Sequence, residues 1–176
     1  MKPLNESIAE YKKQLEKGNI QNAYKGLMEY MMKLRTHLKV KHPTFYVPSN
    51  LYQGYMDMSY FSFTPKSLTD KKLKVAIVFI HDKTRFEVWL GAVNKKIQHE
   101  YWNLIKESGW DKYQISPKAK GVDSIIEHTL VNNPDFNDID NLTKKIEKSV
   151  LEFSDDVLDF LSKKNNISNK RTNAQH

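Results

Sequence analysis

The residues that most restrict the fold are LKVAIVFI, at 73–80, because apolar side chains fall on both faces of this segment. Such a run is typical of a strand in the middle of a sheet. The turn residues HDKT follow, and then apolar and polar side chains alternate over 84–90, which predicts a second strand with two different faces. A two-residue loop, Asp82-Lys83, would join the two strands as an antiparallel hairpin.

This hairpin loop sets the register between the two strands. The predicted pairs are Phe79 with Phe86, Val78 with Glu87, and Ala76 with Trp89. One face of the hairpin is then wholly apolar, whereas the other places Arg85, Glu87 and Trp89 opposite aliphatic side chains. Two interpretations of the mixed face are open. Either Arg85 and Glu87 face solvent, or a helix covers the face and leaves a cleft in which Glu87 needs a partner such as Arg85.

A helix is predicted over 94–108, with Asn94 as its N-cap and Gly109 just after its end. At 100° per residue, Gln98 and Tyr101 fall on the same side as the apolar residues. A buried glutamine needs partners for its carbonyl and for both N–H donors. Gln98 could tie the helix to a strand end or a loop backbone, or it could offer a bidentate contact to a ligand.

The remaining periodic segments complete the fold prediction. Helices are expected at 4–15, 20–38 and 139–161, and strands at 54–64, 112–116 and 124–131. The order ααβββαββα predicts an α+β fold with an N-terminal αα-hairpin, a mainly antiparallel sheet of about five strands, one inserted helix and a long C-terminal helix. We expect a single domain over residues 1–164 and a disordered tail over 165–176.

The composition is that of a soluble globular protein. The chain has 176 residues, of which 39% are hydrophobic and 28% charged, and it has no cysteine. Its longest apolar run, 75–80, is far shorter than the ~20 residues of a membrane helix. The N-terminal residues contain no apolar segment typical of a signal peptide. We therefore expect a cytoplasmic protein that has no disulfide framework, thiolate nucleophile or membrane contact.

The net charge of +7 raises the possibility of a polyanionic partner. The basic cluster at the end of the second predicted helix contains Lys33, Arg35, Lys39 and Lys41, beside an aromatic loop suited to stacking on nucleic-acid bases. However, all but three of the 28 basic residues are lysine, whereas nucleic-acid sites favour arginine. Cations at this position would also complement the helix dipole.

No motif of a known enzyme class is found. The histidines lack the spacing of a zinc site, and the chain has no P-loop, dinucleotide fingerprint or nucleophile elbow. The favoured hypothesis is therefore a ligand- or partner-binding module without demonstrable catalysis. Its cleft would lie between the 84–90 strand and the 94–108 helix. The candidate lining residues are Arg85, Glu87, Trp89, Asn94, Gln98 and Tyr101; no metal is expected in this cleft, and the sequence does not identify a cofactor.

Part of the chain, residues 52–116, resembles the restriction-endonuclease-like nuclease superfamily. The branch of recombination nucleases has an acid on the third strand, and a glutamine and a tyrosine one turn apart on the helix that follows. Glu87, Gln98 and Tyr101 match these positions. The resemblance implies clustered carboxylates that hold Mg²⁺, which activates water and neutralises charge on a phosphate.

The chain departs from this family at two positions. Trp89 stands where the family has a lysine, and strand 73–80 has no aspartate, so Asp57 or Asp82 would have to supply the second acid. The nuclease alternative is therefore a degenerate relative. The segment RFEVWL…N…Q…YW also resembles a family of small, uncharacterised bacterial proteins of about this length, for which the resemblance implies no activity.

Overall fold

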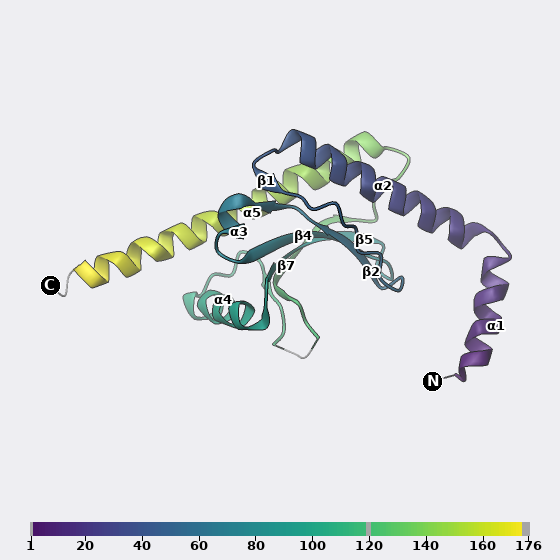
Figure 1. The fold of residues 1–176 in the computed structure, drawn as a ribbon, viewed down its shortest axis with the longest axis horizontal. Helices are drawn as coiled ribbons and strands as arrows, with labels where there is room; N and C mark the ends of the chain where they lie inside the picture. The colour runs from purple at the N-terminus through teal and green to yellow at the C-terminus, as the bar shows by residue number, and fades with distance from the viewer. Residues whose placement is uncertain (1, 119–120, 174–176) are drawn as a thin grey trace.

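The computed structural model describes residues 2–118 and 121–173 of the chain (Figure 1). The helices are α1 (Leu4–Leu15), α2 (Asn19–Lys41), α3 (Lys66–Thr69), α4 (Lys95–Ser108) and α5 (Ile139–Asn173). The strands are β1 (Phe45–Tyr46), β2 (Met58–Ser62), β3 (Thr64–Pro65), β4 (Leu73–Ile80), β5 (Arg85–Ala92), β6 (Gln114–Ile115) and β7 (Ser124–Asn132). The predicted α+β class, with N-terminal helices and a long C-terminal helix, is confirmed.

Five strands form one antiparallel sheet in the order β2-β4-β5-β7-β6. The register expected for the β4–β5 hairpin is confirmed, since Phe79 pairs with Phe86 and Val78 with Glu87. A register shift between Phe86 and Glu87 marks an irregularity where β5 pairs with β7. The strands β4 and β5 are central in the sheet, as the apolar character of residues 73–80 predicts.

The sheet has helices on both faces. Helices α2 and α5 lie across one face, and α4 lies on the other (Figure 1). The side chains packed between the sheet and the first pair of helices include Leu27, Met31, Leu34, Leu38, Val75, Ile77, Phe86, Val88, Ile146, Val150 and Phe153. The apolar face that the hairpin register predicts is therefore the face toward α2 and α5. The mixed face, with Glu87 and Trp89, is on the side of α4.

Several details differ from the sequence prediction. The strand expected at 54–64 begins only at Met58, because Gly54 and Met56 adopt positive φ angles of 66° and 62° and form a turn. After Phe63, residues Thr64–Pro65 form β3, which pairs with β1 in a separate two-stranded sheet. The strand expected at 112–116 shortens to β6.

The two ends of the chain also differ from expectation. A short turn at Gly18 joins α1 to α2 as expected, but α1 diverges from α2 instead of packing along it (Figure 1). Helix α5 continues to Asn173, so most of the expected tail, 165–176, belongs to the helix, and residues 174–176 lie outside the described residues. The segment contains no proline or glycine that would end a helix. Among the described residues, no helix has the length and apolar character needed to cross a membrane.

Candidate functional site

Glu87 is a buried carboxylate with partners from its own strand. Its residue is 3% exposed. The Nε of Arg85 donates to Oε1 at 2.5 Å, and the indole Nε1 of Trp89 donates to Oε2 at 2.6 Å. The interpretation in which Glu87 faces solvent is wrong, because Trp89 and the pairing of β5 between two strands shield it. Arg85, whose side chain is 29% exposed, supplies the partner that burial of a carboxylate requires.

A cleft of about 500 Å³ lies beside this cluster, between the mixed face of β2, β4 and β5 and the beginning of α4. Of the six predicted lining residues, it contains Trp89, Asn94 and Gln98. Arg85, Glu87 and Tyr101 are not in its lining. Glu87 and Arg85 are engaged with each other, whereas Tyr101 is half-buried against the main core, where burial raises the pKa of its phenol.

Two of the predicted residues at this cleft have structural roles. The side-chain oxygen of Asn94 accepts a hydrogen bond from the Ile97 N–H at 3.0 Å, so the expected helix cap is confirmed. The Nε2 of Gln98 donates to the carbonyls of Val122 and Ser124 at 3.0 and 3.2 Å. Gln98 therefore ties α4 to the start of β7, which is the structural account of its position.

The sequence prediction missed three residues that give the cleft most of its chemistry. Tyr52 and Tyr60 lie on one wall with their ring centroids 4.9 Å apart, and their backbones form a bridge. Lys74 is exposed on β4 and has no ion pair with any described residue. The alternation of β2 and β4 places Tyr60 and Lys74 on the face of Trp89. That signal could have identified them, whereas Tyr52 comes from an irregular segment.

The two lysines at the cleft differ in their ion pairing with the described residues. Lys95 pairs with Asp123 at 2.7 Å and also donates to the Val122 carbonyl at 2.9 Å. Lys74, with no such partner among the described residues, is available to an anion. Burial raises the pKa of Tyr60, helped by Tyr52 and Asp123, so its phenol is neutral at physiological pH and can donate a hydrogen bond.

The residues around Glu87 do not fit Mg²⁺. Both oxygens of Glu87 already accept hydrogen bonds. Asp57 precedes β2, two strands away, which places its backbone at least about 10 Å from that of Glu87. Asp82 lies in the turn at the tip of the hairpin, beyond Arg85, where β5 begins. Within the described ranges, no three His, Asp or Glu residues could hold one metal ion. Glu127 lies opposite Trp89 on the neighbouring strand β7, but its Oε1 accepts hydrogen bonds from Ser116 and Ser124, so it is not a free second acid of the kind that the nuclease alternative requires.

The four cations of the proposed polyanion site do not form one surface. At 100° per residue, Arg35 and Lys39 lie more than 100° around α2 from Lys33 and Lys41. Arg35 donates to the Ser49 carbonyl, and Lys41 pairs with Glu147 at 3.0 Å. Two of the four are thus engaged within the protein.

Glu147 itself is a buried acid that joins α5 to the end of α2. It also accepts hydrogen bonds from His42 at 2.7 Å and His37 at 3.2 Å. Burial alone would raise the pKa of Glu147, but the hydrogen bonds from His42, Lys41 and His37 outweigh it and lower the pKa to about 2. The cations at the end of α2 therefore stabilise the packing of two helices.

Comparison with known proteins identifies a family for most of the chain. A family model described as a domain of unknown function (DUF7000) matches residues 4–161, a range that contains the cleft and all five strands of the main sheet. No curated protein and no solved structure matches the chain. The match agrees with the expected family of uncharacterised proteins and gives no support to the resemblance to nucleases.

Proposed function

The chain belongs to the family described as a domain of unknown function (DUF7000), and we propose that it is a binding module whose ligand occupies the cleft between the sheet and α4. The ligand is a small molecule that combines a planar aromatic part with an anionic group. The observation that carries this proposal is the meeting, in one cleft of about 500 Å³, of three aromatic side chains and a lysine that has no ion pair among the described residues. Small-molecule sites commonly have this volume.

Each part of the ligand has a counterpart in the lining. The rings of Tyr60 and Trp89 offer apolar surface to a planar group, and aromatic side chains favour stacked or edge-on partners. Lys74 offers a point charge to the anion. Glu87, held by Arg85, fixes one wall of this site, because it accepts a hydrogen bond from the indole of Trp89 and so sets the orientation of that ring.

A thermal-shift screen with nucleoside monophosphates and aromatic carboxylates tests the proposal. A ligand at one hundred times its Kd stabilises the folded state by about 2.7 kcal/mol, which for a chain of this length raises Tm by about 5–11 °C. A compound that raises Tm of the wild type in this way should have less effect on Tyr60→Leu and Lys74→Ala. The matched control is Lys83→Ala, at the exposed tip of the hairpin.

The proposal fails if no compound of either class raises Tm of the wild type. It also fails if a compound raises Tm of Lys74→Ala and Tyr60→Leu as much as that of Lys83→Ala. The second outcome would place the ligand outside the cleft. Catalysis is not part of the proposal, since the cleft is defined by groups that hold and orient a ligand.

A further inference from the structure

Helix α1 carries an apolar stripe that is left exposed. Leu4, Ile8, Tyr11 and Leu15 follow the i, i+4, i+7, i+11 spacing of one helical face. Leu4 is 74% exposed, Ile8 54% and Tyr11 57%, and no residue of α1 is buried. An isolated helix of 12 residues is marginal in water, and amphipathic helices owe most of their stability to packing of this face. Figure 1 shows α1 standing clear of the sheet.

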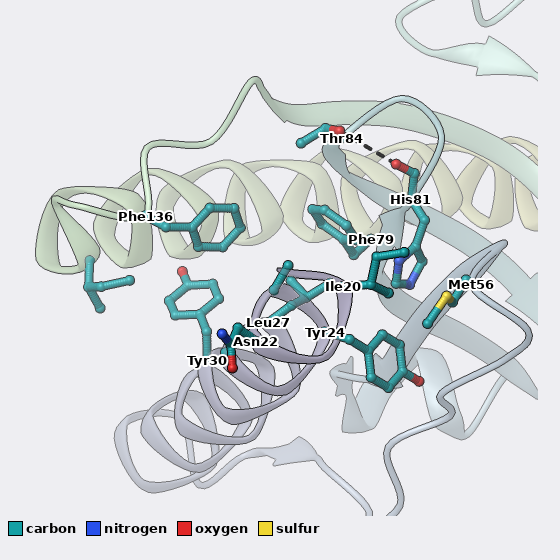
Figure 2. A pocket seen from close by; sticks show the side chains of 13 residues that line it. Ile20, Asn22, Tyr24, Leu27, Tyr30, Met56, Phe79, His81, Thr84 and Phe136 are labelled. Atoms are coloured by element: carbon teal, nitrogen blue, oxygen red, sulfur yellow. Dashed lines mark hydrogen bonds between the residues drawn. The ribbon is translucent and has the colours of Figure 1, made fainter. Parts of the chain in front are cut away.

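The chain also has an apolar groove of about 570 Å³, which has no lining residue in common with the cleft at α4. It lies between the first turns of α2, the tip of the β4–β5 hairpin and the segment leading into α5 (Figure 2). Ile20, Met56, Phe136 and Ile139 line the groove and are each between 36% and 46% exposed. Exposed apolar side chains gathered around one groove mark an interaction surface.

The groove and the stripe of α1 have matching lengths. At 1.5 Å per residue, α1 spans about 18 Å, and residues 20–30 of α2, which contribute one wall of the groove, span about 16 Å. Amphipathic helices bind such grooves through apolar anchors one turn apart, as Leu4, Ile8 and Tyr11 are. At 100° per residue, Lys12 is the charged residue of α1 nearest the stripe, whereas Glu6, Glu10 and Lys13 lie toward the opposite side. Lys12 would meet the aspartates that flank Phe136 and Ile139 in the chain: Asp135, Asp138 and Asp140.

The turn between α1 and α2 directs α1 away from the groove of its own chain. Gly18 adopts a left-handed conformation with φ 73°, and its N–H donates to the Leu15 carbonyl at 2.9 Å. The Nε2 of Gln21 donates to the same carbonyl at 2.8 Å. These two hydrogen bonds fix the direction in which α1 leaves α2, so the groove is open to α1 of another copy.

We propose that the groove of one copy binds α1 of a second copy, in a reciprocal exchange that produces a two-fold symmetric dimer. In such an exchange the same pair of surfaces meets twice. This repetition doubles the area that one short helix would bury, and a specific interface needs about 1,000 Å². The cleft at α4 takes no part in the contact, so the dimer and the ligand site are independent.

Disulfide trapping tests the exchange directly, because the natural chain has no cysteine. Ile8→Cys on α1 and Phe136→Cys at the groove are prepared as separate proteins, mixed and oxidised. The expected product is a mixed disulfide of twice 20.7 kDa, formed about tenfold faster than in the control mixture of Ile8→Cys with Val40→Cys. Val40 is 78% exposed and lies on α2 outside the groove.

The oligomeric state supplies the second readout. The wild type should be a dimer by light scattering. Ile8→Glu should be a monomer whose circular-dichroism signal from the sheet is unchanged. Ala9→Glu is the matched control, since it adds the same charge to the same helix outside the stripe, and it should remain a dimer. Equal trapping rates in the two mixtures, or a monomeric wild type, would overturn the proposal. So would a disulfide formed within one chain of the Ile8→Cys/Phe136→Cys double variant, which would show α1 in its own groove.

Discussion

Replacement of Glu87 by alanine should destabilise the protein by about 3 kcal/mol. The change removes an acceptor that is bonded to a charged guanidinium, for which about 1.5–3 kcal/mol is typical, and it leaves the Trp89 indole N–H without a partner, at about 1–3 kcal/mol. The side chain of Arg85 is 29% exposed and regains part of its hydration, which offsets some of this loss. The expected total is at the lower end of the values for broken buried ion pairs.

Urea denaturation followed by circular dichroism measures this difference. For a chain of 176 residues, a loss of 3 kcal/mol corresponds to a decrease in Tm of about 6–12 °C. The matched control is Glu152→Ala, because Glu152 is an exposed acid paired with Lys148 at 3.8 Å and its removal should cost less than about 0.5 kcal/mol. Equal effects of the two substitutions would refute the reasoning, since Glu87 would then behave as a solvated surface acid.

Substitutions at three further positions probe the contacts around the cleft and between the helices. Asn94→Ala should lower the free energy of unfolding by about 1 kcal/mol through loss of the helix cap, while Asn94→Asp should keep it; urea titration compares the two. Gln98→Ala should cost about 1–2 kcal/mol, because the Ser124 carbonyl loses its amide donor and the Val122 carbonyl keeps only the donor from Lys95; faster hydrogen exchange in residues 121–124 would locate the loss. The pKa of Glu147 is about 2 in the folded state against an ordinary value of 4.5, so the unfolded state binds more protons between these values. Stability from this acid is thus complete above pH 4.5 and declines as the pH falls toward 2, and Glu147→Gln should flatten that part of the unfolding free energy plotted against pH.

The elements that sequence reasoning predicted well depend on local rules. The β4–β5 register follows from a two-residue loop and the alternation of side chains, which involve only neighbouring residues. The cap at Asn94 and the left-handed Gly109 follow from the chemistry of helix ends. Helical geometry alone places Gln98 among apolar residues, and its side chain is half-buried in the structure.

The features that sequence reasoning missed depend on contacts between distant segments. Glu87 is buried because β7, some 40 residues later, pairs with β5, and no pattern within residues 84–90 carries that information. Glu147 meets His37, 110 residues away, so the cations at the end of α2 could be mistaken for a free basic surface. The divergence of α1 follows from the hydrogen bonds at one turn, which the apolar stripe of the helix does not reveal.

The most direct test of the binding site is an NMR fragment screen that follows the backbone amides of the ¹⁵N-labelled protein. Fragments with an aromatic ring and a carboxylate or phosphate should shift the amides of Lys74, Gly91 and Val93, which line the cleft, and leave those of residues 20–30 unchanged. The same shifts should weaken in Lys74→Ala. Fragments that bind only near residues 20–30, or no binding by any anionic aromatic fragment, would contradict the assignment of this cleft as the ligand site.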